Sequence, residues 1–155
     1  HFMPKNGKEN AITKLIKNGK VKLIIMDFPI HGKIDLLAHS ILYYSKNNEQ
    51  YFKLVQLFLN NQSKWFKANN PDSVIINYAK LVGINDTSIS KYQKDKTTSK
   101  NIENKANSYI KKYSIQGTPT TIIEKSNKPI TTKSYKIVGL SNIKDLEKAI
   151  NSLLK

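Results

Sequence analysis

The 155-residue chain contains neither cysteine nor arginine, and each absence excludes a class of chemistry. Without cysteine, these residues can form no disulfide framework, no thiolate zinc site and no thiol nucleophile. Without arginine, they lack the planar guanidinium that binds phosphates and guanine edges in bidentate fashion. The apolar run Leu23-Ile24-Ile25-Met26 is far shorter than the roughly 18 residues that a membrane span needs. The first residues also lack the pattern of a secretory signal, so the protein is cytosolic or its targeting segment lies upstream.

Lysine, in contrast, is abundant. The chain has 26 basic residues, all of them lysine, against 11 acidic ones, and its formal net charge is +15. Such a charge makes nucleic acid or an anionic membrane surface the first partners to consider. However, the lysines are spread from Lys5 to Lys155, with no block longer than Lys111-Lys112. We interpret them as the solvated surface of a compositionally biased protein that has no specific nucleic-acid partner. Nucleic-acid binding driven by the lysines stays as an alternative, after the two functions described below.

The spacing of apolar residues predicts helices in several segments and strands in three short ones. The predicted helices are centred on residues 11–16, 34–42, 51–59, 74–82, 89–92, 102–113 and 143–154. The predicted strands are residues 20–26, 120–124 and 135–138. Asn70-Pro71 is expected to begin one helix and Gly83 to end it, whereas Ser141 is expected to cap the last helix.

This order of elements predicts a single α/β domain, whose length is sufficient for a packed core. An isolated strand is unstable, so the strand at 20–26 must pair with the two late strands in a small mixed sheet. Residues 1–32 and 97–155 would then form the sheet-bearing part, and residues 33–96 an all-helical insertion.

Two segments on either side of the predicted insertion carry a family resemblance. They are residues 21–32, VKLIIMDFPIHG, and residues 115–120, IQGTPT. They resemble, respectively, the strand with its following turn and the cis-proline loop of the DsbA-like thiol–disulfide oxidoreductases. That family has a thioredoxin fold interrupted by a helical domain. The resemblance implies a thioredoxin-like part at 1–32 and 97–155, with the DsbA-like insertion at 33–96.

The family's redox motif is missing from these residues. In DsbA-like proteins a first strand leads into C-x-x-C, which is followed closely by a phenylalanine and a proline. Phe2 and Pro4 stand at the corresponding positions, which would put the second cysteine two residues ahead of His1. We expect the paired cysteines to lie upstream. The alternative is that Met3 is near a true start and that the protein never carried the pair.

The resemblance also implies a substrate-contacting loop made of Gly117, Thr118 and Pro119. The Thr118–Pro119 peptide bond is expected to be cis, and the Thr118 backbone to pair with an extended substrate peptide. The implied function is thiol–disulfide exchange on cysteine-containing polypeptides in the periplasm or cell envelope, with a redox-recycling protein partner and no cofactor. The alternative is a cysteine-less, non-catalytic module that binds peptides or acts as a chaperone, in the cytoplasm if Met3 is the start. Either form would be a monomer or a homodimer.

The remaining candidate residues are interpreted structurally. His1, His31 and His39 do not have the spacing of metal ligands, so we expect no metal site. Asp27 precedes a proline and is expected to stabilise a turn, although a buried acid that tunes a thiol is the alternative. Trp65-Phe66 is expected to anchor the core rather than form an exposed client-binding patch.

Overall fold

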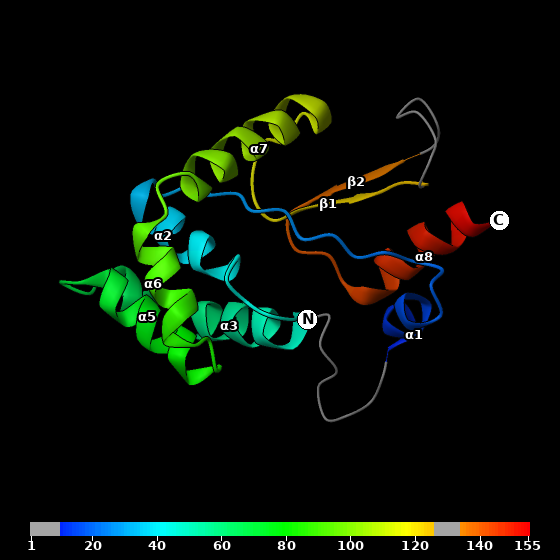
Figure 1. Cartoon of the computed structure of the whole chain (residues 1–155). Helices are drawn as coiled ribbons and strands as arrows, with labels where there is room; N and C mark the ends of the chain where they lie inside the picture. Colours follow the sequence, from blue (N-terminus) through cyan, green and yellow to red (C-terminus); the bar gives the residue numbers. More distant parts are fainter. Residues whose placement is uncertain (1–9, 126–133) are drawn as a thin grey trace. The chain divides into compact units, whose positions relative to one another are not determined.

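The computed structural model describes residues 10–125 and 134–155. Over these residues the chain forms eight helices and one two-stranded sheet, an α/β arrangement dominated by helices (Figure 1). Two compact units are present. The first runs up to Ile25 and resumes at Tyr113, and the second is Met26–Lys112. The helical stretch predicted at residues 33–96 lies within the second unit.

The first unit contains the sheet and two helices. Its elements are α1 (Ala11–Lys17), β1 (Thr120–Ile123), β2 (Tyr135–Val138) and α8 (Ile143–Leu154). The two strands are antiparallel and lie side by side in Figure 1, with Thr120 opposite Val138 and Ile123 opposite Tyr135.

One face of this sheet is buried under the helices. Ile123 and Ile137 contact a small core formed by Ile12 of α1 and by Leu146 and Ile150 of α8. Paired residues of neighbouring strands share a face, so Thr121 and Tyr135 belong to this covered side as well. The side chains of Thr120, Ile122, Lys136 and Val138 therefore belong to the opposite face.

The second unit is helical. Its elements are α2 (Lys33–Leu42), α3 (Asn48–Asn60), α4 (Gln62–Phe66), α5 (Pro71–Leu81), α6 (Asp86–Lys94) and α7 (Thr98–Tyr113), the last residue of α7 belonging to the first unit. The core of this unit includes Ile41, Leu54 and Ile75, whose side chains are fully buried. Gly83 follows α5 with a φ of 85°, as expected of a residue that ends a helix in the left-handed region.

Asparagine begins five of these helices, which explains where they start. At each, the side-chain oxygen accepts a hydrogen bond from the backbone N–H three residues later, in place of the missing intrahelical partner. The five residues are Asn10, Asn47, Asn70, Asn85 and Asn142. The prediction that Ser141 caps the last helix is therefore wrong, because Asn142 binds the N–H of Asp145 at 2.9 Å.

The predicted strand at residues 20–26 is also wrong, since no strand forms there. A strand needs a neighbour for its backbone, and in the described part of the chain β1 and β2 pair only with each other. The side chains of Leu23, Ile24 and Ile25 are 37%, 59% and 46% exposed. The expected mixed sheet is thus reduced to one antiparallel pair.

Candidate functional site

The segment between the end of α7 and the start of β1 contains the three residues predicted to contact substrate. Gly117 is half-buried, whereas Thr118 and Pro119 are exposed at the surface of the first unit. The Thr118–Pro119 peptide bond is cis. The structure therefore brings the three residues together at one exposed loop, which leads directly into β1.

Gly117 faces open space. A Cβ atom at this position would meet no heavy atom within 4 Å. Its φ also lies outside the left-handed region, so no feature of the fold itself demands glycine here. A side chain at position 117 would instead fill the space through which another chain could approach the backbone.

Two hydrogen bonds define the end of this loop nearest the sheet. The hydroxyl of Thr120 donates to the carbonyl of Gly117 at 2.6 Å. The N–H of Gly139 donates to the carbonyl of Pro119 at 2.8 Å, which extends the ladder between β1 and β2 by one pair. The loop is thus a continuation of the edge of the sheet.

The register shows which backbone groups of β1 point away from β2. Hydrogen-bonded and non-hydrogen-bonded pairs alternate along an antiparallel ladder. Because Pro119 and Gly139 form a hydrogen-bonded pair, Thr121 and Ile123 form the next ones. The N–H and C=O groups of Thr120 and Ile122 are therefore directed toward the outer edge of β1, which no other described strand covers.

Asp27, His31 and His39 lie in the second unit, where each histidine shares a hydrogen bond with an aspartate. Asp27 shares a 2.7 Å hydrogen bond with Nδ1 of His39 and accepts one of 3.0 Å from the hydroxyl of Tyr43. Burial, followed by the carboxylate of Asp27, raises the pKa of Tyr43 to about 12. His31 shares a 3.0 Å hydrogen bond with Asp35, and His1 lies outside the described residues. Asp27 therefore joins its own segment to α2. This role is broader than the stabilisation of a turn that the sequence predicts.

Trp65 confirms the prediction of a core anchor. Its side chain is buried, and its indole N–H donates to the carbonyl of Phe58 at 2.9 Å. Phe66 packs partly buried against the same core. The short helix α4, which carries both residues, was not predicted because five residues are too few for a recognisable helical pattern.

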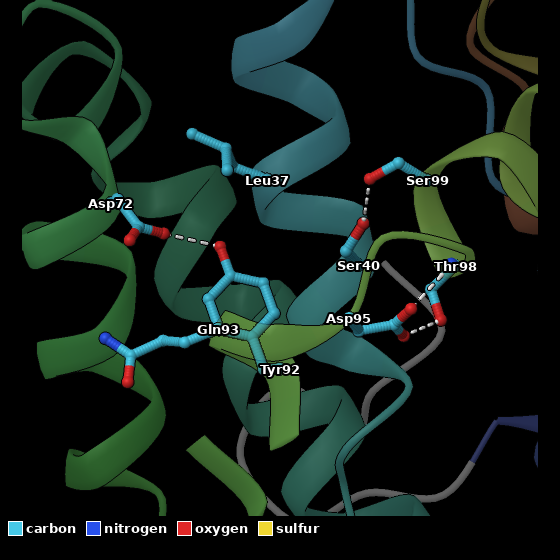
Figure 2. A pocket seen from close by; sticks show the side chains of 8 residues that line it. All are labelled: Leu37, Ser40, Asp72, Tyr92, Gln93, Asp95, Thr98 and Ser99. Atoms are coloured by element: carbon cyan, nitrogen blue, oxygen red, sulfur yellow. Dashed lines mark hydrogen bonds between the residues drawn. The ribbon is translucent and has the colours of Figure 1, made fainter. Parts of the chain in front are cut away.

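A polar cavity of about 340 Å³ in the second unit was not predicted (Figure 2). Its walls come from α2, α5, α6 and the start of α7. They consist of Leu37, Ser40, Asp72, Tyr92, Gln93, Asp95, Thr98 and Ser99. Asp95 stands just ahead of Thr97-Thr98, a pattern typical of a helix start, so a cap for α7 could have been predicted there.

The two carboxylates that line this cavity already accept hydrogen bonds from other side chains of the protein. Asp72 accepts a 2.5 Å hydrogen bond from the hydroxyl of Tyr92, and Asp95 accepts one of 2.6 Å from Tyr44. Thr97 and Thr98 also donate to Asp95 through both backbone and hydroxyl groups. These bonds, led by the Thr98 hydroxyl, hold the pKa of Asp95 well below its usual range. These hydrogen bonds join helices of the second unit. Because they already occupy the carboxylates, we assign no ligand to the cavity.

In the described part of the chain, no three histidine, aspartate or glutamate side chains are grouped closely enough to hold a metal ion. Within residues 10–125 and 134–155, no helix has the length and apolar character needed to cross a bilayer.

A family model described as Thioredoxin matches residues 3–150 of the chain. No curated protein and no solved structure matches it.

Proposed function

Because the chain belongs to the thioredoxin family, we propose that its first unit binds extended polypeptides at the loop formed by Gly117, Thr118 and Pro119. The protein would be a thiol–disulfide oxidoreductase of the DsbA-like type that acts on cysteine-containing polypeptides in the cell envelope. The paired cysteines would then come from residues outside these 155, since exchange requires a thiolate and none is present here.

The open space at Gly117 carries this proposal. A glycine in an ordinary backbone conformation, with no neighbour near its Cβ position, leaves room for a second backbone. The adjoining Thr118 and Pro119 are exposed, so they are accessible to a partner. Polypeptide binding by strand addition uses the main-chain groups of such a segment and is tolerant of sequence.

The outer edge of β1 supports the DsbA-like reading. Its N–H and C=O groups at Thr120 and Ile122 point to an edge with no other strand in the described part of the chain, and the apolar side chains at residues 23–25 are exposed. One additional strand paired with β1 would satisfy the backbone groups. The first strand that leads into the cysteine pair of DsbA-like proteins is such a strand.

A second candidate function is polypeptide binding without redox chemistry. The observation that favours it is the absence of any cysteine from a chain that otherwise carries the loop. The two functions differ in one feature of the gene. A reading frame that encodes C-x-x-C ahead of His1, after an apolar strand, supports the oxidoreductase, and an in-frame stop before Met3 supports the binding module.

Polypeptide binding is tested with the substitution Gly117→Val. Affinity is measured by fluorescence anisotropy with a labelled, uncharged peptide of alternating threonine and valine. A second peptide, with proline at alternate positions, cannot form a strand and serves as the ligand control. We expect Gly117→Val to weaken binding by at least about tenfold. Gln116→Val, in the exposed residue just before it, should leave the affinity unchanged.

Two results would overturn the proposal. One is that the wild-type chain binds the proline-containing peptide as tightly as the strand-forming one. The other is that Gly117→Val binds as the wild type does. Circular dichroism of each variant establishes that the fold is retained, as the empty surroundings of Gly117 lead us to expect.

A further inference from the structure

The segment from Tyr113 to Pro119, which contains the loop proposed to bind polypeptide, is held at both ends by β2 and the residue that follows it. At its end nearest the sheet, Gly139 donates to the carbonyl of Pro119, as described above. At its other end, the ammonium group of Lys136 donates to the carbonyl of Ser114 at 3.2 Å and to that of Tyr113 at 3.4 Å. Both anchors come from residues of the same strand or its immediate continuation.

The Lys136 contact stabilises an unusual backbone turn. Ser114 has a φ of 49°, in the left-handed region, which is unfavourable for a residue that carries a Cβ atom. It directly follows Tyr113, the last residue of a helix, and the carbonyl groups at a helix C-terminus carry partial negative charge. A cation at this end of a helix is favourable. Lys136 therefore supports the residue at which the chain leaves the helix and enters the loop.

Tyr113 has a second connection to the sheet. Its hydroxyl donates to the carboxylate of Glu124, the residue just after β1, at 3.1 Å. Tyr113, which lies just before the segment that leads to Pro119, is thus joined both to β2, through Lys136, and to the residue after β1. Residues 115–118 connect Tyr113 and Ser114 to Pro119. Because Gly117 and Thr118 are only a few bonds from the turn that Lys136 holds, a shift of this turn would move them.

We propose that Lys136 is a positioning residue for polypeptide binding. It holds the turn at Tyr113 and Ser114, and thereby sets where the backbone of Gly117 and Thr118 lies relative to the edge of β1. The inference rests on the proposed function of the loop, but it assigns a role to a side chain that does not itself belong to the loop.

The test compares three lysine variants in the anisotropy assay with the alternating threonine and valine peptide. Lys136→Met removes the ammonium group and should weaken binding by about tenfold, because hydrogen bonds to a charged group contribute on this order. Lys136→Arg retains a cationic donor and should bind within about twofold of the wild type. Lys148→Met makes the same change of charge at an exposed position of α8 and should have no effect.

A further variant separates positioning from direct contact with the peptide. In Lys136→Met combined with Ser114→Gly, glycine adopts the left-handed conformation without a steric penalty, so the turn no longer depends on the lysine. We expect the double variant to recover most of the lost affinity. Thermal unfolding followed by circular dichroism checks that every variant folds, and Lys136→Gln replaces Lys136→Met if the latter does not.

Each outcome decides the inference. Unchanged binding by Lys136→Met, an equal loss in Lys148→Met, or a double variant as weak as Lys136→Met would overturn the positioning role. These results are distinct from failure of the proposed function. If the wild type binds the peptide and Gly117→Val impairs it while Lys136→Met does not, only the role of Lys136 is rejected.

Discussion

Asp27 and His39 share a hydrogen bond of 2.7 Å between the carboxylate Oδ1 and the imidazole Nδ1. Oδ2 of the same carboxylate accepts a hydrogen bond from the hydroxyl of Tyr43, the residue that follows α2. One side chain therefore joins the segment that begins the second unit to α2 and to the residue that follows this helix. The carboxylate is mostly shielded from solvent, with 14% of its side chain exposed.

Replacing Asp27 by alanine should destabilise the second unit. The change removes two hydrogen bonds to a shielded carboxylate, so we expect the free energy of unfolding to fall by about 1–3 kcal/mol. Urea unfolding followed by Trp65 fluorescence measures it, since Trp65 lies in the core of this unit. Glu49→Ala is the matched control. Its ion pair with Lys53 is highly exposed, so its loss should affect stability much less than the loss of Asp27. Equal effects of the two substitutions would contradict the expectation.

Stability should decrease at high pH because several tyrosines have a raised pKa in the folded chain. Burial, with Asp27 as the second cause, raises the pKa of both Tyr43 and Tyr51 to about 12. In the unfolded chain tyrosine has a pKa of about 10. Between about pH 10 and pH 12 the unfolded chain loses protons that the folded chain retains, so the free energy of unfolding falls as the pH rises.

Urea midpoints measured across this range test the alkaline prediction. The double variant Tyr43→Phe and Tyr51→Phe should show a shallower decrease, because it lacks two of the titrating hydroxyls. Some decrease should remain, since the pKa values of Tyr44 and Tyr92 are also raised, chiefly by burial. Identical slopes for the variant and the wild type would show that these two hydroxyls do not contribute.

All the helices except α4 were predictable from sequence because their determinants are local. The apolar spacing of α2, α3, α5, α7 and α8 is contained within each helix, and so are the cap at Asn70 and the ending at Gly83. The strand at residues 20–26 was not predictable in the same way. Its composition is that of a buried strand, but pairing depends on a distant segment, and the described residues provide none.

The same difference between local and distant determinants applies to the candidate site. Gly117, Thr118 and Pro119 are consecutive, so the family resemblance of residues 115–120 was enough to propose them as candidates. Lys136 approaches Ser114 across 22 residues of sequence, and no local pattern distinguishes this lysine from the 25 others. The position of a lysine ammonium group depends on the register of β1 and β2, which only the folded structure defines.

Two positions of α5 should respond very differently to truncation. Ile75 is fully buried in the core of the second unit, whereas the side chain of Leu81 is 74% exposed. Ile75→Ala should lower the free energy of unfolding by about 2–5 kcal/mol, through lost burial and the cavity left behind. Leu81→Ala, in the same helix, should change it by no more than about 0.5 kcal/mol. Urea unfolding of both variants measures the difference, and a large effect at Leu81 would mean that another surface covers it.

The start of α8 provides a test of which residue caps it. Asn142→Ala removes the acceptor for the N–H of Asp145 and should lower the free energy of unfolding by about 1 kcal/mol. The effect is expected to extend to the first unit as a whole, because Leu146 and Ile150 of this helix form its core. Asn142→Ser retains a side-chain acceptor and should preserve most of the stability. Ser141→Ala is the adjacent control and should change the stability by a few tenths of a kcal/mol at most. A larger loss at Ser141 than at Asn142 would move the cap back to the residue that the sequence pattern favours.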